Sequence, residues 1–419
     1  INQMKKLLTK LFSHTLFRGS MIMFAGTTVV NAGNYLFHLL MGRMLGPSEY
    51  GILASIISSL YIINIVPLAL NVAIVKFVSS AQGKGHDDEI CGFYYWLQKK
   101  IIVFGLGVTV ILFFLIPAWS AFLKIVDPIP LVLIALTFPL LVLLMVLRSF
   151  FTGVLNFTAY SLSTITEVIL KIVLSVILVY LGFSVTGVVV ASLLSLIGTY
   201  AVSANFLKFK IAGKSAFFEH KKELLLFTLP VILSAFSLNS LFSTDIVLVK
   251  HFFSSFEAGI YASLSVLGKV IFFASSSLVA VMFPLVSQKH ARGENYRRIF
   301  WLTFGIIAMA SLFLTVVYLL FPKLMISLLF GSKYLAGANL LFWFGVFLAF
   351  YSLASVMISF FLSLGKTKVV VFPLISAGMQ VLFIIIWHQN LQIVIFDSII
   401  ATFILLVSLL LYYPYATKS

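Results

Sequence analysis

Charged side chains are scarce in this sequence. Asp, Glu, Lys and Arg make up only 10% of the 419 residues, whereas hydrophobic residues make up 62%. The mean hydropathy is +1.15. A soluble domain usually carries about 25% charged residues, so the composition excludes an ordinary soluble protein. The apolar runs are continuous rather than alternating, which excludes a transmembrane β-barrel. We therefore expect an all-α, polytopic membrane protein.

Signatures of disulfide, metal and nucleotide chemistry are missing as well. The one cysteine, Cys91, excludes an intramolecular disulfide and leaves no partner for a cysteine-based metal site. The seven histidines form no His-x-x-x-His pair, and no Gly-x-x-x-x-Gly-Lys-Ser/Thr loop occurs. The segments between the apolar runs are too short for a separate catalytic domain. We expect no cofactor, no metal and no enzymatic activity.

About twelve runs are long and apolar enough to span a membrane, for which about 20 residues are needed. We expect the spans at 20–41, 50–75, 101–122, 129–147, 158–181, 185–207, 224–249, 258–286, 299–321, 336–362, 369–388 and 391–414. The stretch 4–17 mixes Lys5, Lys6 and Lys10 with leucines. It is too polar to span, and its pattern predicts an interfacial amphipathic helix.

The positions of the basic residues predict the orientation. The net charge is +16, from 28 basic and 12 acidic residues. With the N-terminus in the cytoplasm, two basic residues fall within spans, 21 fall inside, and five fall outside, namely Arg43, Lys124, Lys250, Lys323 and Lys333. The positive-inside rule therefore predicts a multi-pass protein of the cytoplasmic membrane with both termini cytoplasmic. The topology accounts for the positive charge, so we expect contacts with membrane lipids and no nucleic-acid partner.

A long internal repeat divides the chain. The pattern Glu-x-Gly-Ile-x-Ala-Ser that begins at Glu49 recurs at Glu257, an offset of 208 residues (257 − 49). Ser-Phe-Phe at 149–151 recurs at 359–361. With six spans in each half, both halves have the same orientation, and the repeat is parallel. We expect an N-terminal six-helix lobe, residues 1–210, and a C-terminal six-helix lobe, residues 211–419, with the substrate site between them.

Charges inside the expected spans are candidates for function because a charge in lipid costs a few kcal/mol. Glu167 and Lys171 share one face of the fifth span. They form either a local ion pair or part of a wet cavity, in which Lys171 meets an anion and Glu167 exchanges a proton. Lys269 lies near the middle of the eighth span, and we expect it to point inward.

Four more charged residues allow two interpretations each. Asp245, near the outer end of the seventh span, makes a polar helix contact or binds a coupling cation. Asp397, early in the last span, is a candidate for function like the other charges within spans, or it lies near an interface. Lys76 and Arg148 close the second and fourth spans as positive-inside anchors or as contacts for an anionic headgroup. Arg favours bidentate phosphate contacts, whereas Lys acts as a point charge.

Three segments resemble a known family. The segment 42–52, GRMLGPSEYGI, resembles the signature of polysaccharide-type flippases, the O-antigen (Wzx-like) transporters of the MATE-like superfamily. Its echo at 245–261, DIVLVKHFFSSFEAGIY, and the segment 148–156, RSFFTGVLN, also resemble this family. The resemblance extends over the whole chain and implies a MATE-like fold. The motif positions are Gly46, Glu49, Gly51, Glu257 and Gly259.

The resemblance implies a flippase that translocates undecaprenyl-pyrophosphate-linked oligosaccharides across the cytoplasmic membrane by alternating access, for polysaccharide, O-antigen, lipopolysaccharide or capsule synthesis. The expected partners are this lipid-linked substrate, membrane lipids and polysaccharide-assembly proteins. Lys171, Lys269, Lys76 and Arg148 would be the cavity cations. Glu167 and Asp245 would be the coupling or proton-binding residues.

Three other functions compete with this one. A MATE-type drug or cation antiporter would need acidic residues in its cavity, and Glu167 has Lys171 beside it. Asp245 keeps this alternative open. The second alternative is a lipid II-type precursor flippase. The third is a non-transporting scaffold in a polysaccharide-assembly complex.

Overall fold

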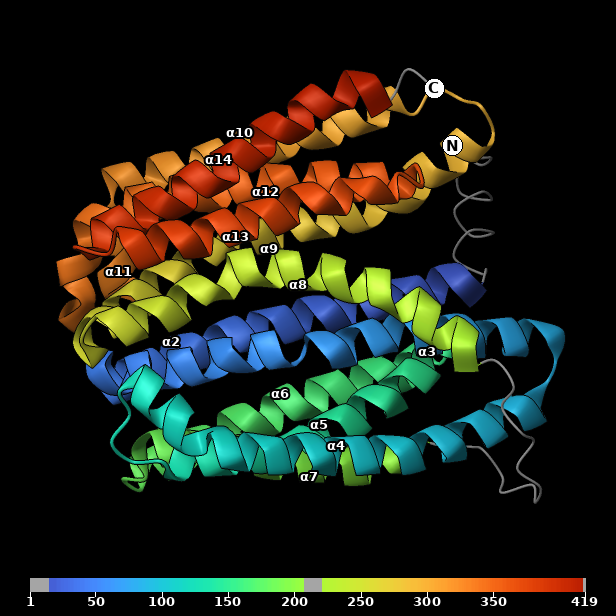
Figure 1. Cartoon of the computed structure of the whole chain (residues 1–419), viewed down its shortest axis with the longest axis horizontal. Helices are drawn as coiled ribbons and strands as arrows, with labels where there is room; N and C mark the ends of the chain where they lie inside the picture. The colour runs from blue at the N-terminus through green and yellow to red at the C-terminus, as the bar shows by residue number, and fades with distance from the viewer. Residues whose placement is uncertain (1–14, 207–220, 417–419) are drawn as a thin grey trace, which may run out of the picture. The chain divides into compact units, whose positions relative to one another are not determined.

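The computed structural model describes residues 15–206 and 221–416, which are helical almost throughout and include no strand. Nine helices of this described part are long and apolar enough to cross a membrane. Helices α2 (Thr15–Ile63), α3 (Ile65–Lys84) and α8 (Lys221–Phe252) cover the other expected spans, 20–41, 50–75 and 224–249. The all-α polytopic fold is thus confirmed (Figure 1). Most of the expected interfacial helix, 4–17, lies outside the described residues.

The helices group into two compact units. The first unit comprises Ile1–Met44 and Val66–Ile232, and the second comprises Leu45–Ile65 and Leu233–Ser419. After α2 and α3, the first unit contains α4 (Asp87–Leu123), α5 (Ile129–Gly153), α6 (Phe157–Tyr180) and α7 (Ser184–Ala204). The unit boundary falls within α8, whose part from Leu233 onward belongs to the second unit. The helices of the second unit that follow are α9 (Ser255–Ala291), α10 (Arg297–Leu320), α11 (Pro322–Leu329), η1 (Ser332–Leu340), α12 (Leu341–Ser363), η2 (Thr367–Val370), α13 (Val371–Ile386) and α14 (Leu391–Ala416).

The units differ from the expected lobes, 1–210 and 211–419, in two respects. The main boundary falls after Ile232, and the segment Leu45–Ile65 packs within the second unit although it precedes most of the first along the chain. Most of this segment is the second arm of α2, which begins after a kink and ends at Ile63. Gly46 has φ 75° and ψ 174°, a conformation open essentially only to glycine. Pro47 follows as the first residue of the new arm, where its missing N–H costs nothing.

The repeated motif marks a helix start in both halves. In the second copy, Ser254 is the N-cap of α9, and its Oγ accepts a hydrogen bond from the backbone N–H of Glu257 at 3.3 Å. The Glu257 carboxylate accepts one in return from the backbone N–H of Ser254 at 3.0 Å. This reciprocal capping box satisfies two N–H groups that a helix start otherwise leaves free. Gly46 is the counterpart of Ser254 at the same offset of 208 (254 − 46).

The second repeated motif supplies a core aromatic residue to each unit. Phe150 and Phe360 are both fully buried. In the first unit, the Phe150 ring lies 5.0 Å from the Tyr94 ring, which joins α5 to α4. In the second unit, the Phe360 ring lies 4.1 Å from Phe300 of α10 and 5.7 Å from Tyr413 of α14. The repeat thus preserves a packing position that holds neighbouring helices together.

Replacing Phe360 by Ala should destabilise the second unit by about 2 kcal/mol or more, because truncating a core aromatic residue leaves a cavity. The matched control is Phe114→Ala in α4, since the Phe114 side chain is 82% exposed. Unfolding of the purified variants in detergent micelles measures the difference. Equal losses for the two substitutions would contradict this assignment of the core.

Candidate functional site

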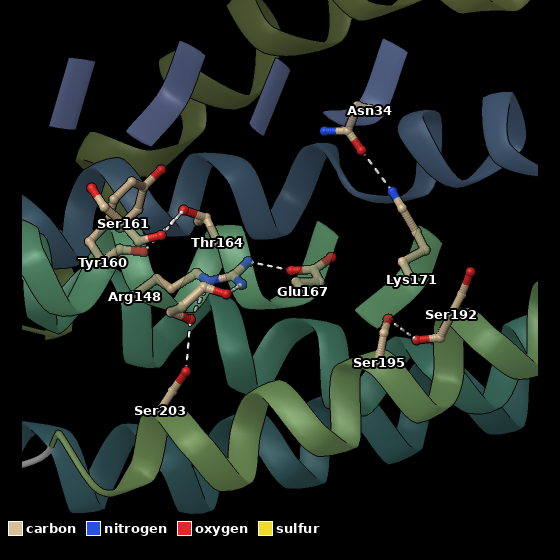
Figure 2. A network of polar contacts seen from close by, with 11 residues as sticks. Asn34, Arg148, Tyr160, Ser161, Thr164, Glu167, Lys171, Ser192, Ser195 and Ser203 are labelled. Carbon is tan, nitrogen blue, oxygen red and sulfur yellow. Dashed lines mark hydrogen bonds and ion pairs between the residues drawn. The ribbon is translucent and has the colours of Figure 1, made fainter. Parts of the chain in front are cut away.

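An ion pair between α5 and α6 organises the polar residues of the first unit. The Arg148 Nη1 and Glu167 Oε2 atoms are 2.7 Å apart, and the two side chains are 17% and 25% exposed. Arg148 also donates to Ser163, from Nε to the hydroxyl oxygen at 2.9 Å and from Nη2 to the backbone oxygen at 3.0 Å. Ser203 of α7 donates to the same Ser163 hydroxyl at 2.8 Å. Figure 2 shows this network, which connects three helices.

A tight turn between α5 and α6 makes this pairing possible. Leu155 has a positive φ of 59°, and the Asn156 side chain caps α6 by accepting from the backbone N–H of Ala159 at 3.1 Å. The chain therefore reverses within a few residues and brings the start of α6 back along the end of α5. Glu167 faces Arg148 for this reason, although 19 residues (167 − 148) separate them.

Lys171 is bound by neutral groups from α2. Its Nζ donates to the Asn34 Oδ1 at 2.7 Å and lies 4.6 Å from the centre of the Phe37 ring. Glu167, one turn away, attracts the Lys171 charge, but its ion-pair partner is Arg148 (Figure 2). Of the two interpretations of Glu167 and Lys171, the local ion pair is therefore not the contact that the structure shows. The Lys171 charge is stabilised by a dipole and a π face.

Asp245 is the centre of a buried polar cluster in the second unit. The residue is 1% exposed on α8. Its Oδ2 accepts from the Tyr261 hydroxyl of α9 at 2.8 Å, and its Oδ1 accepts from the backbone N–H of Ile246 at 2.9 Å. Tyr261 in turn interacts with Ser398 and lies within electrostatic range of Asp397, both on α14. Residues of α8, α9 and α14 thus converge on one buried site.

This cluster has more acceptors than donors. Asp397 is 4% exposed, so its side chain is buried against other helices, a burial that the sequence did not predict. Gln380 of α13 donates from Nε2 to the Ser398 hydroxyl at 2.9 Å. Within the described residues, the Asp397 Oδ2 and the Gln380 Oε1 are buried and accept no hydrogen bond. Buried oxygen atoms without donors are costly, and a proton or a small cation would satisfy them.

Lys269 of α9 lies beside aromatic rings. Its Nζ is 4.1 Å from the centre of the Phe242 ring, and the side chain is half-buried. The Phe242 ring is itself 5.1 Å from Phe272 and 5.5 Å from Tyr351. Lys269 is also within electrostatic range of Asp245. Each unit therefore contains one intramembrane lysine over an aromatic ring and one carboxylate near it.

The other predicted residues have simpler surroundings. Lys76 is exposed near the end of α3. The remaining motif residues lie at the two helix starts, Glu49 and Gly51 on the second arm of α2 and Gly259 on α9. Lys250, expected in an outer loop, is 1% exposed in the last turn of α8. A cation there suits the negative end of the helix dipole.

Sequence reasoning missed the neutral partners of these charges. They are Asn34, Phe37, Ser163, Ser203, Tyr261, Gln380 and Ser398. The available signal was the presence of Asn or Gln inside an apolar span, where an amide needs a partner. That signal does not identify which distant charge the amide contacts.

Comparison with known proteins agrees with this architecture. A family model described as "Polysaccharide biosynthesis protein" matches residues 40–339. An inward-facing multidrug resistance MATE family transporter of the MOP superfamily aligns with a TM-score of 0.75 at 15% identity, covering 92% of this chain and 95% of its own. The comparison with curated proteins found no match.

Two more solved structures have the same fold. The MATE multidrug transporter DinF-BH aligns with a TM-score of 0.69 at 18% identity, covering 97% of this chain and 96% of its own. A MOP superfamily transporter from Pyrococcus furiosus, whose title describes a binding pocket of reverse polarity, aligns with a TM-score of 0.64 at 17% identity, covering 97% and 96%. The expected MATE-like fold is therefore confirmed.

A double-mutant cycle tests the ion pair of the first unit. Arg148→Gln and Glu167→Gln should each destabilise the protein, and their combination should cost less than the sum, with a coupling energy of about 1 kcal/mol. Unfolding in detergent micelles measures all three variants. The exposed pair Lys289–Glu294, with its atoms 3.6 Å apart, is the control and should show almost no coupling. Strictly additive losses for Arg148 and Glu167 would contradict the pairing.

Proposed function

Because the chain belongs to the polysaccharide biosynthesis protein family, we propose that it is a flippase for undecaprenyl-pyrophosphate-linked oligosaccharides. It would move them from the cytoplasmic to the outer leaflet of the cytoplasmic membrane. The observation that carries the proposal is an intramembrane lysine in each unit, Lys171 and Lys269, set over an aromatic ring. A pyrophosphate has to cross the bilayer with its negative charge, and fixed cations lower the cost of that step.

Lys171 is suited to an exchangeable anion. Its closest partners, Asn34 and Phe37, carry no charge, and Glu167 is paired with Arg148. A phosphate oxygen can therefore replace the Asn34 oxygen with a gain in charge–charge attraction. Lys also tolerates changing geometry better than Arg because its ammonium group acts as a point charge. Arg148, already held by Ser163 and Glu167, would position this face of α6 rather than bind substrate directly.

Alternating access would pass the headgroup between the two lysines, as in transporters built from parallel repeats. Lys76, exposed near the end of α3, would meet the headgroup first on the cytoplasmic side. The undecaprenyl chain would stay in the bilayer throughout. With no nucleotide-binding loop in the sequence, we expect an ion gradient or downstream consumption of the product to drive the transport.

The buried cluster in the second unit is our candidate for ion coupling. Asp245 and Asp397 bring two carboxylates to one site, and the free oxygens of Asp397 and Gln380 can receive a proton or a monovalent cation. Binding there would change the charge that Lys269 experiences, since Asp245 attracts it. Asp245 would thus link Lys269, the substrate-binding lysine of this unit, to the coupling site. Glu167 is a weaker coupling candidate because it already has an ion-pair partner, Arg148.

The same acidic cluster favours one competing function. A MATE-type cation or drug antiporter uses buried carboxylates, and two of them lie in the second unit. Such a transporter would have little use for Lys171 and Lys269, which repel cations. The two functions therefore differ in the sign of charge that the lysines select.

Removing either lysine should slow flipping. In liposomes that contain the purified protein and a fluorescent undecaprenyl-pyrophosphate oligosaccharide, Lys171→Ala and Lys269→Ala should each lower the rate of inter-leaflet movement about tenfold or more, the effect of losing one charge-assisted contact. The control is Lys333→Ala, at an exposed lysine of η1. Unchanged rates in both variants would refute the cationic path. Export of a cationic dye without lipid movement would instead support the antiporter.

Neutralising the acidic cluster should uncouple transport from the gradient. Asp245→Asn and Asp397→Asn should each abolish the stimulation by a proton or sodium gradient. An amide side chain does not take up a proton near neutral pH, and it has no negative charge to attract a cation. The matched control is Asp127→Asn, where the exposed carboxylate caps α5 by accepting from the backbone N–H of Ile129 at 3.0 Å. Flipping rates measured with and without each gradient decide the matter. Full stimulation in both variants would place the coupling elsewhere.

A further inference from the structure

The two copies of the repeated motif touch each other inside the second unit. A Cβ atom on Gly51 would collide with the backbone oxygen of Ser255, and a Cβ atom on Gly259 would collide with the backbone oxygen of Pro47. The backbones of the second arm of α2 and of α9 are therefore in direct contact. Any side chain at either glycine would separate them.

These two contacts are one contact repeated. Ser255 follows Pro47 by 208 residues (255 − 47), and Gly259 follows Gly51 by the same interval. Each copy of the motif thus places its glycine against the helix start of the other copy. The sequence repeat and the close approach have a common explanation, namely that the motif binds to its own duplicate.

The second arm of α2 is docked firmly at this point. Tyr50 is fully buried, with its ring 5.8 Å from Phe330 and 6.3 Å from Tyr334. Ser55, one turn beyond Gly51, and its counterpart Ser263 are both fully buried. Water has no access to these three side chains in the conformation that the structure represents.

The docked arm is bounded by a break at each end. Gly46 has the glycine-specific conformation described above, and the regular helix is interrupted at Asn64, between the end of α2 and the start of α3. The unit boundary falls at the same places, after Met44 and after Ile65. Short breaks at both ends of a rigid helix are the usual hinges of a moving element.

We propose that the segment Leu45–Ile63 is a gate, closed here by the mutual glycine contact and opened when the segment leaves α9. On the predicted orientation, this junction lies at the outer end of the path. The gate rests on the proposed transport function, since a gate needs a substrate path. Opening would expose Ser55 and Ser263 together, because they are equivalent positions of the two copies.

Thiol labelling from outside tests the gate without measuring transport. In a Cys91→Ser background, a single Ser55→Cys reporter should react slowly with a charged, membrane-impermeant maleimide in right-side-out vesicles. Adding Gly51→Ala or Gly259→Ala should speed the reaction about tenfold, because overpacking the contact favours the undocked arm. A Ser263→Cys reporter should respond in parallel. The control is Gly305→Ala on α10, where an added Cβ meets no atom within 4 Å.

A second measurement keeps the glycines intact, in case the alanine variants do not fold. Ser55→Cys protein in liposomes should label faster when lipid-linked oligosaccharide is being transported. Unchanged labelling in folded glycine variants and during transport would overturn the gate, as would labelling from the cytoplasmic side only. Faster labelling in the glycine variants, combined with no lipid movement by protein whose glycines are intact, would support the gate and refute the proposed substrate instead.

Discussion

The ion pair between Arg148 and Glu167 decides which charge of the first unit is left for function. A charge inside a bilayer is tolerated only with a partner or with water. Glu167 has a lysine one helical turn away, yet its carboxylate is 2.7 Å from the arginine of the preceding helix. Lys171 is consequently bound by an amide and an aromatic ring. These neutral partners stabilise the Lys171 charge, and its interaction energy still becomes more favourable when an anion binds.

The second unit solves the same problem with different residues. Lys269 also lies over an aromatic ring, but its nearby carboxylate, Asp245, is tied to Tyr261 rather than to an arginine. Two buried acceptors nearby, the Asp397 Oδ2 and the Gln380 Oε1, have no hydrogen-bond partner among the described residues. These contacts are the basis of our proposal that both units bind an anion and that the second also couples transport to an ion. The proposed difference between the units follows from the partner of the carboxylate, which is Arg148 in the first unit and Tyr261 in the second.

The sequence predicted the helices and the repeat because both depend on local pattern. Long apolar runs identify α4 to α7, α9, α10 and α12 to α14 as candidate membrane spans, and the glycine motif marks two helix starts. Partner choice was not predictable. Asn34 contacts a lysine 137 residues away, and Glu167 prefers Arg148 over its own helix neighbour. The burial of Asp397 and Lys250 was not predictable, because position along a span does not reveal burial within a bundle.

The central claim is that the lysines of this transporter recognise the negative charge of a lipid pyrophosphate. The most direct measurement compares the binding of two ligands to the purified protein, one oligosaccharide carried either by undecaprenyl pyrophosphate or by an uncharged undecaprenyl lipid. We predict that the pyrophosphate form binds about tenfold more tightly or better, and that Lys171→Ala and Lys269→Ala reduce this preference. Equal affinity for the two lipids in the unmodified protein would contradict the account.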